Sequence, residues 1–223
     1  MTTQRPPRRG PDRRGILKGA AALGVAAATP LTLPRRAMAA PQRGGTFRVG
    51  VHDGNTNDSW DPGTTESILM IHASHVARSY LTEITNENTL GPDLATAWEA
   101  TAGDASEWRF ELARNATFHD GRPVTAADVI ASMNYHRGPD SASAASALLT
   151  EITDIRPDGD HAVIFTMARG NADLPYLLSD YHLVICPATS DGGIDWQGGI
   201  GCGPSRVVDF EAGGAIVEFP VED

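Results

Sequence analysis

The chain has 223 residues, 41% of them hydrophobic, which suits one large domain or two small ones and excludes wholesale disorder. Its formal charge at pH 7 is −10, from 18 basic and 28 acidic residues. Residues 1–39 hold eight basic residues and one acidic residue, and the remaining body therefore has 10 basic against 27 acidic residues, a net charge of −17. Because such a body repels nucleic-acid phosphates and anionic membrane surfaces, we expect neither as a partner.

Residues 1–39 have the layout of an export signal peptide. A basic region is followed by an uncharged stretch, residues 19–34, that is too short and too weakly apolar for a membrane span. The segment from Asp12 to Lys18, which contains the pair Arg13-Arg14, resembles a twin-arginine export signal. The resemblance implies that the twin-arginine export machinery carries the folded protein out of the cytoplasm. The alternative is a disordered basic tail on a cytoplasmic protein.

Small residues mark the predicted cleavage site. Ala37 and Ala39 form an A-x-A pattern, which predicts cleavage between Ala39 and Ala40. No cysteine lies near this bond, and a lipid anchor is therefore not expected. Residues 40–45 are then a short linker, and residues 46–223 form the exported body. We expect this body to be soluble on the periplasmic or other extracytoplasmic side.

The body has strand-like and helix-like hydrophobic patterns in an irregular order. Alternation of apolar and polar residues predicts strands, whereas apolar residues at steps of three and four predict helices. We expect strands at residues 46–51, 108–112, 151–156, 161–167, 183–186 and 215–219. We expect helices at residues 68–81 and 174–178, and a third that Thr125 starts as N-cap with Asp128 in the capping-box position. The mixture indicates an α/β or α+β body with a mixed sheet.

Motifs of catalysis and cofactor binding are missing from the sequence. It has no G-x-S-x-G elbow, no H-E-x-x-H and no G-x-x-x-x-G-K. We therefore expect no enzyme, no catalytic residue and no cofactor. His72 and His75 are three residues apart on a predicted helix, a spacing that two metal ligands can have, but no carboxylate is spaced to join them. We expect two partly buried helix histidines there and no metal site.

The two cysteines leave two alternatives open. Cys186 and Cys202 are 16 residues apart, and export to an oxidising compartment would allow a disulfide worth about 3 kcal/mol. Two unpaired cysteines are the other alternative, because sequence separation does not establish the geometry of a disulfide.

A long ordered set of motifs links the body to a known family. Trp108–Leu112 is followed by Phe118-His119-Asp120-Gly121-Arg122-Pro123-Val124-Thr125-Ala126-Ala127-Asp128-Val129, and further matching segments are Gly44–Val49, Trp60–Pro62, Gly91–Glu99 and Gly201–Val207. The body thereby resembles the extracytoplasmic solute-binding proteins of peptide, nickel-chelate and oligosaccharide ABC importers, the dipeptide/oligopeptide-binding family 5. The likeness covers most of residues 44–210.

The resemblance implies a fold and a function. It implies an α/β periplasmic-binding-protein type II-like fold of two lobes, of which residues 46–223 form the first lobe with its inserted subdomain, truncated, with the second lobe absent. It also implies capture of peptides or similar small solutes for import, with ABC transporter permease and ATPase subunits as partners. The alternatives are a non-functional truncated fragment of such a protein and a carrier of a nickel chelate or an oligosaccharide.

The resemblance also points to candidate ligand-binding residues. Thr65, Glu66 and Ser67 follow the Asp-Pro step, where the family's chain approaches the ligand cleft. The alternative is an ordinary N-capping cluster for the helix that begins near residue 68. Cys202 and Gly203 lie where the family's Gly-Thr-Gly-Pro step nears the hinge. A pocket-lining role of Cys202 competes with its disulfide to Cys186.

Overall fold

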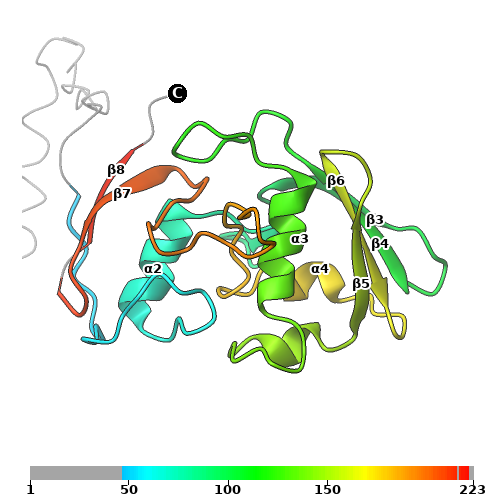
Figure 1. Cartoon of the computed structure of the whole chain (residues 1–223), viewed down its shortest axis with the longest axis horizontal. Helices are drawn as coiled ribbons and strands as arrows, with labels where there is room; N and C mark the ends of the chain where they lie inside the picture. The colour runs from blue at the N-terminus through cyan, green and yellow to red at the C-terminus, as the bar shows by residue number, and fades with distance from the viewer. Residues whose placement is uncertain (1–46, 215, 221–223) are drawn as a thin grey trace, which may run out of the picture. The chain divides into compact units, whose positions relative to one another are not determined.

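The computed structural model describes residues 47–214 and 216–220, and the residues from Val49 onward form one compact unit (Figure 1). The predicted signal peptide, with Arg13, Arg14, Ala39 and Ala40, lies outside the described residues, as does the linker at 40–45. None of the helices in the described part combines the length and the hydropathy that a membrane span needs.

Three α-helices, one 3-10 helix and eight strands are described in these residues. The helices are α2 (Ile68–Ala77), α3 (Ala126–Tyr135), the 3-10 helix η1 (Ser146–Leu149) and α4 (Leu174–Leu177). The strands are β1 (Thr82–Ile84), β2 (Leu90–Pro92), β3 (Ala95–Ala100), β4 (Glu107–Leu112), β5 (Ile152–Pro157), β6 (Ala162–Met167), β7 (Ser205–Phe210) and β8 (Ile216–Pro220).

The strands form one four-stranded sheet, in the order β3-β4-β6-β5, and two hairpins, β1-β2 and β7-β8. Every described strand pair is antiparallel, whereas a mixed sheet was expected. Short connections explain the antiparallel pairs β1-β2, β3-β4 and β5-β6, because neighbouring strands joined by a short turn run antiparallel and a parallel pair needs a long crossover. The turn between β5 and β6 contains Gly159, whose φ of 74° suits a residue without a Cβ.

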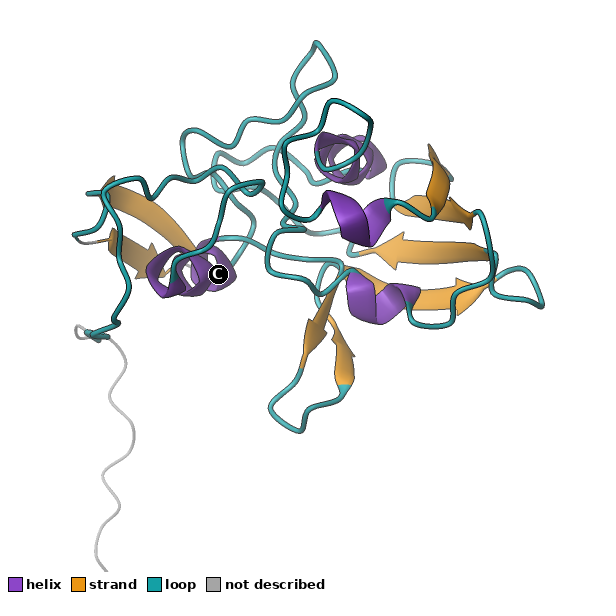
Figure 2. Ribbon diagram, turned by 90° about the horizontal axis from the view of Figure 1, so that it is seen from below, coloured by secondary structure: helices purple, strands orange, loops and turns teal. Residues whose placement is uncertain are grey.

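The main core lies between the four-stranded sheet and the helices. Phe110 on β4 and Phe165 on β6 are fully buried and meet edge to face, with ring centroids 5.4 Å apart. Val129 and Met133 of α3 belong to the same buried cluster. Figure 2 shows α3 and α4 on the same side of this sheet.

A smaller core joins α2 to the β7-β8 hairpin. Met70, Ala73 and Ala77 of α2 are buried there with Trp60. The Trp60 ring lies 5.6 Å from the ring of Phe210 on β7, measured between centroids. The β7-β8 hairpin therefore covers one face of α2 (Figure 1).

The predicted start of α3 is confirmed. The Thr125 backbone nitrogen and hydroxyl both donate hydrogen bonds of 2.8 Å to Asp128 Oδ2, and the capping box is complete. The second oxygen of the same carboxylate accepts a 2.8 Å bond from the backbone nitrogen of Ala188. Asp128 thus caps its helix and also holds a segment 60 residues further along the chain.

Three other expectations about elements are corrected. No strand is formed at 47–51, where Phe47 and Val49 are 89% and 62% exposed and hence have no core to alternate against. Residues 183–186 are buried but do not form a strand, because their backbone hydrogen bonds go to isolated partners and not to a neighbouring strand. The Cys186 nitrogen, for example, donates to Ser132 Oγ. The first helix ends at Ala77 rather than at 81, since the next residue has extended backbone.

Candidate ligand-binding site

Asp61 organises the segment that carries the first group of candidate residues. Its Oδ1 accepts the backbone nitrogen of Gly63 at 2.8 Å, and its carbonyl oxygen accepts the Thr65 hydroxyl at 3.2 Å. Ser67 then caps α2, because its hydroxyl accepts a 3.2 Å bond from the backbone nitrogen of Met70. Asp-Pro-Gly turn chemistry in the sequence is a signal for this arrangement.

The three candidate residues of this segment differ in their exposure. Thr65 and Ser67 are both 3% exposed and use their hydroxyls within the segment, whereas Glu66 is exposed. They border a cavity of about 310 Å³, lined by Asn55, Thr56, Asn57, Asp58, Ser59, Thr64, Thr65, Glu66, Ser67 and Met70. Among the described residues, the charged groups in this lining are the carboxylates of Asp58 and Glu66, which would attract a cationic group such as an amine.

The second group of candidate residues packs against the other end of α2. The Gly203 backbone nitrogen donates to Ala77 O at 3.1 Å, and its carbonyl oxygen lies 3.0 Å from His119 Nε2. A Cβ on Gly203 would come within 2.6 Å of the carbonyl carbon of Ala77, and the close contact therefore requires glycine. Ten residues of helix, about 15 Å long, lie between the two groups. The structure does not bring Cys202 and Gly203 to the cavity beside Glu66.

Both cysteines are free thiols in the structure, and the disulfide that the sequence allowed is not formed there. Cys186 is fully buried in a small apolar cluster with Tyr80 and Val184. Cys202 is partly buried, and its carbonyl oxygen accepts a 3.4 Å bond from the Ser79 hydroxyl. Burial raises the pKa of the Cys186 thiol and raises that of Cys202 to about 12. Neither side chain is a reactive thiolate at neutral pH.

Arg78, directly after α2, is a buried residue that the sequence patterns did not reveal. It is 1% exposed, and its guanidinium donates to the carbonyl oxygens of Trp60 at 2.8 Å and Trp196 at 3.0 Å. Its central carbon lies 5.2 Å from the Trp60 ring centroid, within the range of a cation–π contact. This side chain ties the loops before α2 and before β7 to the end of α2.

The two histidines that share the α2 helix are both exposed, not partly buried as expected. The Nδ1 atoms of His72 and His75 each lie 2.8 Å from the carbonyl oxygen four residues earlier, Ile68 O and Ile71 O. Within residues 47–214 and 216–220, no cluster of three or more His, Cys, Asp or Glu side chains is placed to hold a metal ion.

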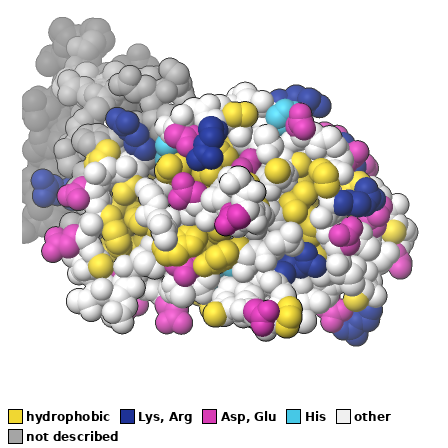
Figure 3. All heavy atoms as spheres, viewed as in Figure 1, with side chains coloured by type: hydrophobic (Ala, Val, Ile, Leu, Met, Phe, Trp, Pro, Cys, Tyr) yellow, Lys and Arg dark blue, Asp and Glu magenta, His cyan; other side chains and the backbone are white. Residues whose placement is uncertain are grey.

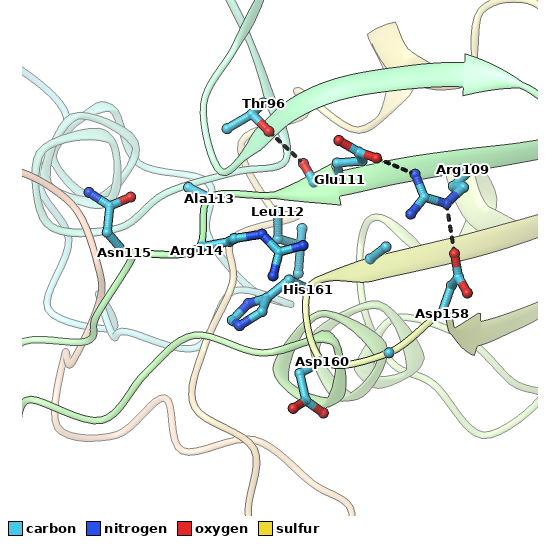
Figure 4. A pocket seen from close by; sticks show the side chains of 12 residues that line it. Thr96, Arg109, Glu111, Leu112, Ala113, Arg114, Asn115, Asp158, Asp160 and His161 are labelled. Carbon is cyan, nitrogen blue, oxygen red and sulfur yellow. Dashed lines mark hydrogen bonds and ion pairs between the residues drawn. The ribbon is translucent and has the colours of Figure 1, made fainter.

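A second cavity of about 560 Å³ lies beside the ends of β4 and β6 (Figure 4). Arg109 donates to Asp158 Oδ2 at 2.7 Å and to Glu111 Oε1 at 2.6 Å, and two carboxylates thus neutralise it. Arg114 and His161 also line this cavity (Figure 4). The surface of this sheet carries interspersed basic and acidic side chains (Figure 3), among them the ion pair between Arg156 and Glu107.

Solved structures of binding proteins share this fold. The match to MoaA of A. tumefaciens R10 in complex with mannopinic acid has a TM-score of 0.67 at 23% identity, over 75% of this chain and 35% of that chain. The Escherichia coli murein tripeptide binding protein MppA matches with a TM-score of 0.65 at 20% identity, over 76% of this chain and 37% of that one. The predicted fold class is therefore confirmed.

The sequence comparisons give the family. The profile of the bacterial extracellular solute-binding proteins, family 5 Middle, matches residues 89–219, more than half of the chain. The chain belongs to this family, and the resemblance drawn from the motifs is confirmed.

Two curated relatives are similar along part of their length. The probable peptide ABC transporter periplasmic-binding protein y4tO of Sinorhizobium fredii is 28% identical over 75% of this chain and 30% of its own length. The probable D,D-dipeptide-binding periplasmic protein DdpA of E. coli is 33% identical over 57% of this chain and 26% of its own length. The chain thus spans less than a third of the length of these relatives.

We predict that Gly203→Ala destabilises the protein by about 1–3 kcal/mol, because the new methyl group overlaps the backbone of Ala77 and Arg78. Urea unfolding followed by tryptophan fluorescence measures this change. Gly103→Ala is the matched control, since a Cβ there meets no atom within 4 Å, and its effect should stay within about 0.5 kcal/mol. Equal effects of the two substitutions would contradict the close contact at Gly203.

We predict that Cys186 and Cys202 of the folded protein react with a thiol reagent at pH 8 roughly 10²–10³-fold more slowly than in urea, since burial raises both pKa values and leaves little thiolate. The number of thiols that react in urea without reductant distinguishes two free cysteines from a disulfide. Two reactive thiols are expected, whereas none would show that the exported protein forms the disulfide after all.

Proposed function

We propose that the chain acts as the extracytoplasmic solute-binding component of an ABC importer, that it is not an enzyme, and that it captures peptides or similar amine-bearing small solutes. Membership of family 5 is the observation that carries this proposal. Permease and ATPase subunits of the importer are the partners that it implies. The relatives y4tO and DdpA carry peptide-binding descriptions, and this supports a peptide cargo.

The cavity beside α2 supports an amine-bearing ligand. Glu66 is exposed at its edge, and Asp58 lies in the same lining, which contains no basic side chain among the described residues. A carboxylate pair of this kind favours an ammonium group over a carboxylate or a neutral sugar. The fold alone does not choose the cargo, because solved relatives hold ligands as different as the peptide RPPGFSPFR and Ni(L-His).

We predict that a pool of di- to pentapeptides raises the melting temperature of the chain, because a ligand that binds only the folded state stabilises it by mass action. At 100 times the dissociation constant the gain is about 2.7 kcal/mol, or roughly 5–10 °C for a chain of this size. Differential scanning fluorimetry with N-acetylated peptides, oligosaccharides and nickel–histidine in parallel measures the selectivity.

Glu66→Gln should lose most of the peptide shift, whereas Glu87→Gln, another exposed glutamate, should keep it. An equal shift in both variants would remove Glu66 from the site. A shift by oligosaccharides or nickel–histidine alone would favour the alternative cargo. No shift with any pool would favour the alternative that this length of chain does not capture solute by itself.

We also propose export through the twin-arginine route, with cleavage between Ala39 and Ala40. The order of the motif, the weakly apolar stretch and the A-x-A pattern in the sequence support this, together with the periplasmic descriptions of relatives such as DdpA.

We predict that changing Arg13 and Arg14 together to Lys abolishes export of the full chain, because the twin-arginine machinery recognises the paired guanidinium groups. Cell fractionation and N-terminal sequencing measure the outcome, and the exported protein should begin at Ala40. Changing Arg8 and Arg9 to Lys is the matched control and should leave export intact. Undiminished export of the Arg13/Arg14 variant would contradict the twin-arginine route.

A further inference from the structure

A buried histidine follows α3 and holds the loop that leads away from the helix. His136 is fully buried, and its Nδ1 lies 2.6 Å from the hydroxyl oxygen of Ser143. The same hydroxyl accepts a 3.1 Å bond from the backbone nitrogen of Ala145. Ala144, which lies between Ser143 and Ala145, donates its backbone N–H to Gly63 O at 3.0 Å. The imidazole therefore supports, through one loop, the backbone of the segment that carries Thr65.

The neighbouring residue of α3 supports the same segment at a second point. Tyr135 donates its hydroxyl to Asp61 Oδ1 at 2.8 Å, and the carbonyl oxygen of Asp61 accepts the hydroxyl of Thr65. Tyr135 and His136 also touch each other edge to face, with ring centroids 5.3 Å apart. The C-terminal end of α3 thus holds residues 61–67 through two independent contacts.

Burial of His136 disfavours a second proton on its ring. Its Nδ1 faces the Ser143 hydroxyl, and the backbone of His182 lies beside the ring. The ionisable groups that face the ring are His182 and Asp180, from the segment after α4, and Asp61, with Tyr135 beside it. Protonation would place a positive charge in this buried site, at a cost in free energy.

We propose that His136 is a positioning residue for the candidate ligand segment at residues 61–67, acting through Ser143 and Ala144, and that its protonation releases the contact between Ala144 and Gly63. The inference rests on the proposed function only where it assigns ligand contact to residues 65–67. Burial, more than the nearby His182, lowers the pKa of His136 to about 4. The unfolded value is about 6.5, so the stabilisation is complete above pH 6.5 and is lost as the pH falls through about 4.

The test is an NMR pH titration of the full chain between pH 7.5 and 3.5, without ligand. The amide signals of Gly63, Thr64 and Ala144 should shift together, with an inflection near pH 4 that matches the titration of the His136 ring protons. Since no ligand is present, the outcome does not depend on whether the chain captures a solute. The shift of the melting temperature with peptide tests separately whether the chain captures a solute.

Three variants make the test decisive. His136→Gln keeps an amide for Ser143 but removes the titrating ring, and should abolish the inflection. His161→Gln, in the lining of the second cavity, should retain it. Ser143→Ala should leave the ring titrating while Gly63 and Thr64 no longer follow, and it tests the linkage if His136→Gln fails to fold.

Two results would overturn the proposal. An inflection that survives in His136→Gln would come from another titrating group. Loss of the amide signals of Val163 and Phe165 at the same pH would show global unfolding in place of a local release.

Discussion

The guanidinium of Arg78 is the interaction on which the packing of α2 depends. A charge that is 1% exposed needs acceptors, and it finds them in the carbonyl oxygens of Trp60 and Trp196, with the Trp60 ring as a cover. These contacts fix the chain on both sides of α2 at once. They also bring the backbone of Gly203 against Ala77, where no larger residue fits.

This arrangement gives the two ends of α2 different roles. Its C-terminal end is enclosed by packing, and the glycines around Cys202 serve that packing. Its N-terminal end opens on a polar cavity, where the hydroxyls of Thr65 and Ser67 are used to shape the backbone and the carboxylate of Glu66 remains exposed. The proposed ligand contact at Glu66 therefore depends on the segment that holds this side chain at the edge of the cavity.

Local signals in the sequence predicted the local parts of this structure. The capping box of Thr125 and Asp128, the alternation at 108–112 and the ordered family motif each describe neighbouring residues, and all three are confirmed. Contacts between distant segments left no such signal. Nothing in the spacing of Arg78 predicts two carbonyl partners, one of them 118 residues away. The predicted strand at 46–51 failed for a related reason, because alternation states which side chains share a face but not whether a core lies there.

Because Arg78 and Trp196 are 118 residues apart, the ribosome adds the second partner of this contact long after the first. At 5–20 residues per second, Trp196 is added about 6–24 s after Arg78. Throughout that interval the guanidinium lacks one of its acceptors and stays hydrated, and the end of α2 cannot close. The segment 201–203, which packs on Ala77, is added later still. Closure of this end of α2 therefore waits until residues 196–203 have been synthesised, and a chaperone that binds nascent chains would find the apolar side of α2 uncovered until then.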